Sequence, residues 1–156
     1  IAGIVYVAGI MVPDGTRFAD VVESCKAEEP SAVGIWPHLE HLEGVSAVPE
    51  AAAVEIFFHD GEPAAAARAA AMLTPQSNAA RDGTPHITAD RFGAVPRIYI
   101  EALKDRSVVT FVQRRMQQLV PGAVIRSIDT GHAPMVANAA LLAKMLVEAV
   151  RDLEAA

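Results

Sequence analysis

The sequence predicts an α/β protein built on a parallel sheet, and three observations support this. The 156 residues are 52% hydrophobic and 21% charged, which suits one ordinary domain with a buried core. Three short apolar runs, at residues 4–8, 98–103 and 123–128, have the composition of strands covered on both faces. Helical patterns follow the second and third runs, and this strand–helix alternation favours a parallel sheet.

The first predicted strand covers residues 4–8, and the turn-forming segment 12–15 ends it. The chain opens at Ile1 inside an apolar run, without Met, a polar lead-in or the charged start of a signal peptide. Open sheets usually carry about five or six strands, and only three are predicted here. We therefore expect the chain to start part-way through a domain, with the N-terminal half of the sheet absent from it.

Residues 16–96 are expected to form a mainly helical cap inserted outside the sheet. Residues 54–58 predict a short strand, and residues 64–73 an alanine-rich helix that Pro63 begins. Residues 74–96 are loop-like. The early part of the region is interrupted by three prolines, Pro30, Pro37 and Pro49. The expected organisation is a core strand and turn over 1–15, the cap over 16–96 and a C-terminal core over 97–156.

The C-terminal core alternates regularly. A strand at 98–103 precedes a helix that Thr110 is expected to cap, and residues 121–122 (Pro-Gly) end that helix. The strand at 123–128 precedes a second helix from about Asn138. Each helix carries an apolar stripe at the spacing of a helix that packs on a sheet.

Composition excludes several classes of protein. The net charge of −6 and the absence of a basic cluster argue against nucleic-acid or anionic-membrane partners. The longest apolar stretch, residues 1–13, is shorter than the roughly 20 residues of a membrane span. We therefore expect a cytoplasmic protein.

No metal or cofactor is expected. His38 and His41 lie three residues apart near Glu40 and Glu43, but zinc needs three or four convergent ligands. Cys25 stands alone, which excludes a disulfide framework and is typical of a packed thiol.

Two loops are expected to carry the chemistry, because each directly follows a predicted strand. Ligands of open α/β sheets bind at the carboxyl ends of the strands. The loop 103–107 holds Asp105, and the loop 129–134 holds His132. A carboxylate that binds one ring nitrogen of a histidine leaves the other nitrogen to act as a general base. Asp129 is a competing acid, but it shares a tight loop with His132 and ranks below Asp105.

The span 97–146 resembles the last part of an α/β-hydrolase, in which the order along the chain is nucleophile, acid, histidine. In this resemblance the acid matches Asp105, and the histidine matches His132 in its Gly-His pair. Residues 5–15 resemble the strand and turn that follow the nucleophile helix. The segments that resemble small esterases related to plant methylesterases and hydroxynitrile lyases are Phe57-Phe58-His59-Asp60, Leu73-Thr74-Pro75-Gln76-Ser77 and Val95-Pro96-Arg97-Ile98-Tyr99-Ile100.

The resemblance implies a carboxylic ester hydrolase that needs no cofactor and acts on a small, apolar or aromatic ester. Trp36, Phe57 and Phe58 are candidates for lining its pocket, although they could equally be cap core. The family's G-x-S-x-G motif is absent from the chain. The nearest segment, residues 44–48 around Ser46, lacks the second glycine and runs into a proline. The nucleophile serine is therefore expected upstream of this chain.

Other interpretations stay open at this point. The chain could be a non-catalytic relative that binds a small ligand, or an inactive fragment that needs a complementary N-terminal chain. A homodimer is also compatible with the sequence. A hydroxynitrile lyase ranks lower, because Ala133 follows His132 where the lyases resembled here carry a lysine.

Overall fold

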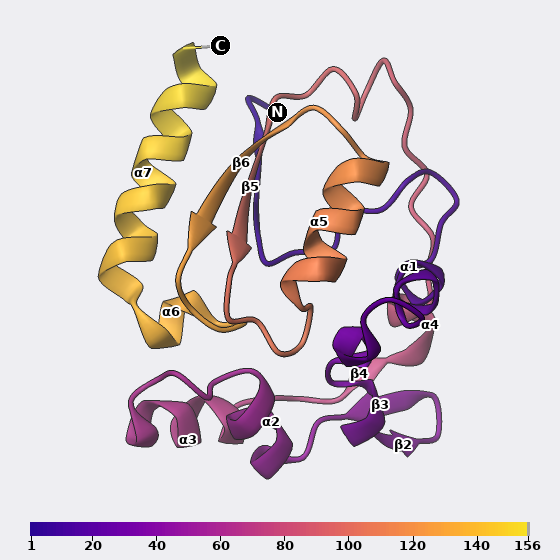
Figure 1. Cartoon of the computed structure of the whole chain (residues 1–156), viewed down its shortest axis with the longest axis vertical. Helices are drawn as coiled ribbons and strands as arrows, with labels where there is room; N and C mark the ends of the chain where they lie inside the picture. Colours follow the sequence, from indigo (N-terminus) through magenta and orange to yellow (C-terminus); the bar gives the residue numbers. More distant parts are fainter. Residues whose placement is uncertain (156) are drawn as a thin grey trace.

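A computed structural model describes residues 1–155 and confirms the α/β class, with a parallel sheet between helices (Figure 1). The strands are β1 (Ile4–Val7), β2 (Glu40–Leu42), β3 (Val45–Ala47), β4 (Gln76–Ser77), β5 (Arg97–Ala102) and β6 (Ala123–Ile128). The α-helices are α1 (Phe18–Cys25), α2 (Glu50–Ile56), α3 (Pro63–Ala71), α4 (Asn78–Arg81), α5 (Thr110–Leu119), α6 (Pro134–Ala137) and α7 (Ala139–Ala155), and two short 3₁₀ segments cover Pro30–Val33 and Trp36–His38. Among these residues, no helix combines the length and the hydropathy that crossing a bilayer requires.

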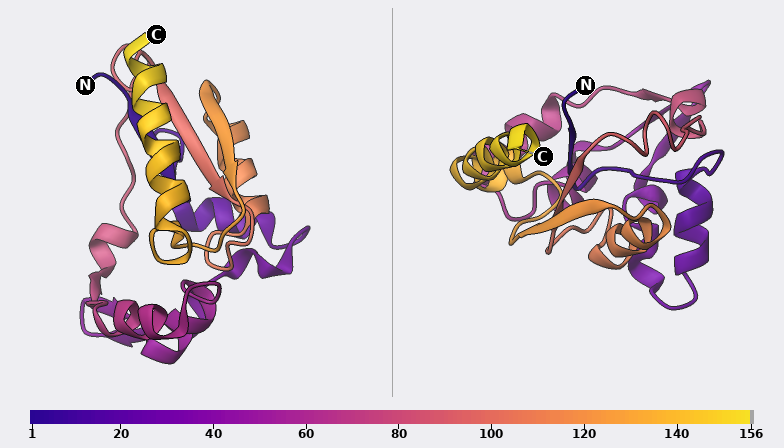
Figure 2. Two further views of the ribbon diagram at one scale, coloured as in Figure 1. Left: turned by 90° about the vertical axis from the view of Figure 1, so that its left-hand side faces the viewer. Right: turned by 90° about the horizontal axis from the view of Figure 1, so that it is seen from above.

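The main sheet has the order β1-β5-β6, and all its strands are parallel. Every residue of β5 is buried, whereas all four residues of β1 are half-buried because β1 pairs on one side only. Helix α7 covers one face of the sheet and α5 the other (Figures 1 and 2). The central strand β5 therefore lies in the middle of a three-layer core.

The two faces of β5 have different partners. Ile98, Ile100 and Ala102 pack with Leu142 and Ala149 of α7 in one apolar cluster. Such alternation is the period-two pattern of a strand that is covered on both sides.

The opposite face of β5 carries Tyr99, which packs with Met11 and Val120. The Tyr99 hydroxyl donates a hydrogen bond to the carbonyl of Gly9 (2.7 Å), and burial raises the pKa of Tyr99 above its ordinary value. The phenol therefore stays protonated and fixes the chain that leaves β1.

Helix α1 completes the core on the α5 side. Val22 and Cys25 pack against Val112 and Met116 of α5, and Cys25 is 2% exposed. The lone cysteine is thus a buried core thiol.

Residues between β1 and β5 form α1–α4 and a small antiparallel sheet, β2-β3-β4 (Figure 1). Helices α2 and α3 and this small sheet lie beyond the carboxyl ends of the β5 and β6 strands (Figure 1). The predicted alanine-rich helix at 64–73 is confirmed as α3. The small sheet was not predicted, because its strands are only two or three residues long and β4 pairs with a strand far earlier in the sequence.

Three local predictions are wrong. Residues 74–96 are not all loop, since they contain β4 and α4. Residues 54–58 do not form a strand, since Val54 to Ile56 are the end of helix α2. Pro49 precedes the helix, and Ala52, Ala53 and Ile56 lie on one buried helical face, so helical spacing prevails over the β-branched residues. Thr110 does not cap α5 from outside. It is the first helical residue, and its hydroxyl donates to the carbonyl of Leu103 (3.1 Å).

A buried carboxylate, that of Glu101, joins β5 to helix α5 and to the neighbouring strand β6. Glu101 accepts two hydrogen bonds from Arg114 of α5 (3.0 and 3.1 Å) and one from Ser127 of β6 (2.9 Å). The side chain of Glu101 is 5% exposed and that of Arg114 is 57% exposed. Arg114, followed by Ser127 and Gln117, lowers the pKa of Glu101 despite its burial.

Replacing Glu101 tests this network through its pH dependence. Glu101→Gln is expected to lower the free energy of unfolding by about 1–2 kcal/mol at neutral pH, since charged hydrogen bonds are lost. The folded pKa lies below the ordinary value of 4.5, so the native protein loses this stabilisation as the pH falls below that value. Urea unfolding at neutral pH and at about pH 3 measures both values.

The matched control is Glu23→Gln, which removes an exposed carboxylate paired with Lys26. That variant is expected to change stability by less than about 0.5 kcal/mol at either pH. A Glu101→Gln deficit that stayed constant down to about pH 3 would contradict the lowered pKa.

Candidate active site

Asp105 and His132 lie on loops that leave neighbouring parallel strands at the same edge of the sheet. The pairing of β5 with β6 continues past the strand ends, because the amide of Leu103 donates to Ile128 and that of Lys104 to Thr130. This extended ladder holds the two loops together. His132 Nδ1 lies 2.9 Å from Asp105 Oδ2, although the residues are 27 positions apart in sequence.

The Asp105 carboxylate is fully buried and held by the main chain of its own loop. Its Oδ1 accepts from the amides of Ser107 (2.7 Å) and Val108 (2.9 Å). Its Oδ2 faces His132 and also accepts from the side-chain amide of Gln113 (3.3 Å). Both oxygens are therefore fixed, and the carboxylate points at the imidazole without freedom to rotate.

Gln113 is a site residue that the sequence reading missed. This glutamine is fully buried on α5 and bonds both polar groups of Ala102, at the end of β5, and the carbonyl of Val108 (2.7 Å). It lies on the inward face of the helix beside Val112 and Met116. A glutamine within an apolar stripe is the signal that could have identified it.

His132 combines a fixed ring with access to solvent. Its Nδ1 faces a carboxylate, which only accepts, so Nδ1 carries the proton and Nε2 carries the lone pair. The side chain is 29% exposed, whereas Asp105 is not exposed at all. The Phe57 ring lies 5.0 Å from the His132 ring, centroid to centroid. The arrangement can take a proton at Nε2 and stabilise the imidazolium that results.

A glycine turn supports the Asp105 loop from the other side. Gly34 has φ +50°, in the left-handed region. A Cβ added there would overlap the carbonyl oxygen of Ser107, two residues after Asp105. Only glycine allows this close approach of the two backbones.

The competing residues lie elsewhere. Asp129 forms an exposed ion pair with Lys104 (2.8 Å), and its side chain is 71% exposed. Ser46 lies on β3, where its hydroxyl contacts Asn78 (2.6 Å) and Arg81 (2.7 Å), and where His41 Nδ1 lies 3.3 Å away. The shorter contact with Asn78 directs the hydroxyl hydrogen away from His41, so this pair lacks the geometry of an activated nucleophile.

The predicted pocket residues are distributed over two apolar clusters. Trp36 and Phe57 pack against a cluster around Ile56, and the Trp36 ring meets Phe18 edge to face. Phe58 is 8% exposed and packs in the alanine-rich cluster that contains Ala133. Of the three, Phe57 contacts the histidine.

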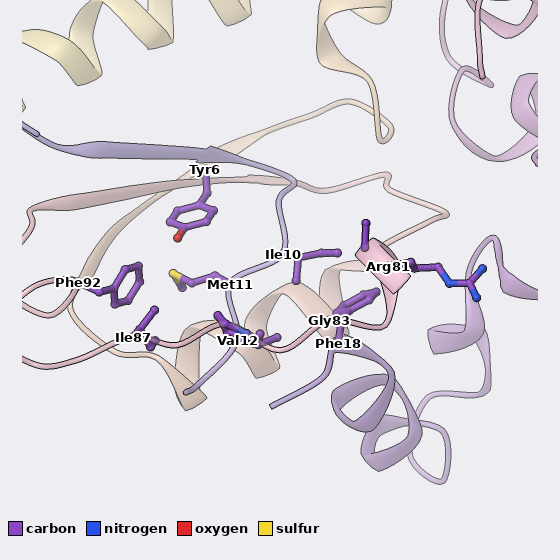
Figure 3. A pocket seen from close by; sticks show the side chains of 11 residues that line it. Tyr6, Ile10, Met11, Val12, Phe18, Arg81, Gly83, Ile87 and Phe92 are labelled. Atoms are coloured by element: carbon purple, nitrogen blue, oxygen red, sulfur yellow. The ribbon is translucent and has the colours of Figure 1, made fainter. Parts of the chain in front are cut away.

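Over residues 1–155, no group of three or more His, Cys, Asp or Glu side chains converges as a metal site would require. His38 ends a 3₁₀ segment, and His41 lies on β2. The hollow in Figure 3 has a volume of about 220 Å³ and is lined by residues such as Tyr6, Met11 and Phe92. None of the predicted site residues lines it.

Removing the Gln113 side chain tests how much its buried hydrogen bonds contribute to the stability of the protein. Gln113→Ala leaves both polar groups of Ala102 without their side-chain partner and opens a cavity, so we expect a loss of about 2–4 kcal/mol in unfolding free energy. Urea denaturation measures it. Gln118→Ala, an exposed glutamine on the same helix, is the control and should cost less than about 0.5 kcal/mol. Equal losses in the two variants would show that the buried hydrogen bonds of Gln113 do not stabilise the fold.

Known proteins share part of this sequence and its fold. No protein-family model matches the chain. A pyrethroid hydrolase of Sphingobium wenxiniae is 39% identical over 71 residues, which are 45% of this chain and 24% of that protein.

Solved structures match over nearly the whole chain. A pyrethroid hydrolase from Sphingobium faniae matches with a TM-score of 0.75 and 26% identity, over 94% of this chain and 60% of that one. Polyneuridine aldehyde esterase matches with a TM-score of 0.75 and 18% identity, over 96% of this chain and 62% of that one. The chain thus spans about three fifths of the length of these structures, and over that length it has the α/β-hydrolase fold.

Proposed function

We propose that this chain supplies the acid and the histidine of a serine carboxylic ester hydrolase. The observation that carries the proposal is the 2.9 Å contact between His132 Nδ1 and the buried Asp105 carboxylate, with the rest of the imidazole partly exposed. In this proposal Asp105 and His132 are two of the three members of a catalytic triad, and a serine is the third.

The proposed reaction follows from the proton positions. His132 Nε2 takes the hydroxyl proton of a serine as the serine oxygen attacks the ester carbonyl. The imidazolium then gives that proton to the departing alkoxide, which leaves as an alcohol, and Asp105 stabilises the imidazolium between the two transfers. Water repeats the sequence on the acyl-enzyme, which releases the carboxylic acid and restores the serine.

We place the nucleophile serine outside residues 1–156. The geometry of Ser46 argues against that residue, since its hydroxyl is bonded to Asn78 and its residue is 5% exposed. The chain spans about 60% of the matched structures, which leaves length in those proteins for a further element.

Covalent labelling tests the position of the nucleophile. A fluorophosphonate probe phosphonylates activated serines, so the intact protein is expected to be labelled on a serine outside this chain. Peptide mass mapping locates the modified residue, and His132→Ala is expected to abolish labelling. A label on Ser46 would overturn the assignment.

We propose a small, apolar or aromatic ester as the substrate class. Phe57, next to the His132 ring, supports this; Trp36 packs against the same apolar cluster as Phe57, and Phe58 is buried in the neighbouring cluster. The relatives, a pyrethroid hydrolase and polyneuridine aldehyde esterase, are named as a hydrolase and an esterase, which supports an ester substrate in general. In this proposal residues 16–96 are the cap over the site, and residues 1–15 and 97–156 belong to the core.

Changing His132 tests the reaction itself. His132→Ala is expected to lower kcat for p-nitrophenyl acetate in the intact protein by at least about 10³-fold, because the general base is lost. His86→Ala is the control, since the His86 side chain is 90% exposed, and its kcat should not change. Turnover by His132→Ala at the native rate would remove His132 from the mechanism, whereas no turnover by the native intact protein would favour a non-catalytic binding protein.

Changing Phe57 tests the substrate class. Phe57→Ala is expected to raise KM for an aromatic acyl ester about tenfold, because the apolar contact beside His132 is lost. Trp36→Ala, which removes an aromatic ring that packs on Phe18, is the comparison. Steady-state kinetics with aromatic and acetyl p-nitrophenyl esters measure the effect. An equal change for both esters would argue against an aromatic acyl subsite at Phe57.

A further inference from the structure

Four consecutive side chains after α2, residues 57–60, all contact the loop that carries His132. The Phe57 ring lies against the His132 ring, and Phe58 packs in one cluster with Ala133. The remaining two, His59 and Asp60, lie over Gly131. We name residues 57–60 the clamp segment.

The strongest of these contacts joins Asp60 to the main chain of the loop. Asp60 Oδ2 accepts from the amide of Gly131 at 2.6 Å, although the two residues are 71 positions apart. Hydrogen bonds from an amide to a carboxylate are among the stronger ones in proteins. The bond is made to the residue directly before His132, so it fixes the backbone from which the imidazole projects.

Two polar atoms of the clamp segment are buried without a hydrogen-bond partner among the described residues, His59 Nδ1 and Asp60 Oδ1. Buried polar atoms are normally paired, so their placement here has an energetic cost. For Asp60 Oδ1, this cost is accounted for if the hydrogen bond that the other carboxylate oxygen accepts from Gly131 sets the position of the side chain.

Gly131 allows the loop to lie directly against the clamp segment. A Cβ at this position would lie 2.6 Å from His59 Cε1 and 2.7 Å from Asp60 Oδ1. Both distances are too short for a real Cβ, so a side chain here would push the loop away from the segment.

We propose that Asp60 is a positioning residue for His132, an inference that rests on the proposed esterase function. Asp105 holds Nδ1 of the imidazole and the Phe57 ring lies against it, but neither contact is made to the backbone from which the imidazole projects. Asp60 adds a second anchor at the neighbouring backbone, which keeps Nε2 aimed at one point. Because the clamp segment lies between α2 and α3, this anchor also links the position of the cap helices to that of the histidine.

The test compares two variants of the intact protein. Asp60→Ala removes the anchor and is expected to lower kcat for p-nitrophenyl acetate about 10- to 100-fold with little change in KM, because a misplaced base slows proton transfer. Asp60→Asn keeps an oxygen that can accept from Gly131, and it should retain activity close to that of the native protein. Asp129→Ala is the matched control, because it removes an exposed aspartate from the loop that carries His132.

A second readout does not depend on turnover. The proton on His132 Nδ1 gives a downfield NMR signal whose exchange with solvent reports how long the bond to Asp105 persists. Asp60→Ala is expected to broaden this signal or speed up its exchange, and Asp129→Ala to leave it unchanged. If His132→Ala retained esterase activity, the proposed function would fail while this signal still tested the positioning role.

The outcomes separate positioning from folding. A lower melting temperature with unchanged kcat and an unchanged His132 signal in Asp60→Ala would overturn the proposal. If Asp60→Ala does not fold, Gly131→Ala provides the same test, since its Cβ would overlap Asp60 Oδ1 and His59 Cε1 and so disrupt the contact between the loop and the clamp segment. Gly131→Ala with native kcat and a native His132 signal would also overturn it.

Discussion

The parallel pairing of β5 with β6 is the constraint on which the rest of the site depends. Six residue pairs join the strands, and two further amide–carbonyl bonds extend the ladder into the loops beyond them. The two loops therefore leave the sheet at fixed positions relative to each other. As a result Asp105 and His132 are in contact, although neither residue lies within a strand. A shift of the register by one residue would turn every side chain of a strand to the other face and separate the pair.

The elements near the sheet could be predicted from the sequence because their signals are local. The apolar runs that became β5 and β6, and the proline that begins α3, act within a few residues. The strand expected at 54–58 was wrong because Ile56 also fits the buried helical face that Ala52 and Ala53 begin, while Val54 lies on the exposed face. Gln113 and Asp60 were missed for a different reason. Their importance lies in bonds to distant backbone groups, and nothing in the neighbouring residues indicates those partners.

Main-chain amides, and not basic side chains, hold the two carboxylates of the site. Asp105 accepts from two amides and Asp60 from one, and no Lys or Arg of residues 1–155 forms an ion pair with either. The charge of Asp105 therefore remains available to the imidazole. In the proposed reaction, the carboxylate would stabilise the positive charge that His132 gains on taking a proton, with no competing cation to displace.

The glycine at position 34 shows how far the requirements of Asp105 extend. Its backbone lies against the carbonyl of Ser107, and the amide of Ser107 holds the carboxylate. Under the proposed function, every substitution at Gly34 is therefore expected to lower activity in a saturation mutagenesis screen, although the residue contacts no reacting atom. Such a result would reflect a displaced Asp105 carboxylate. The effect would come from the hydrogen bond between the Ser107 amide and Asp105, and not from any direct role of Gly34.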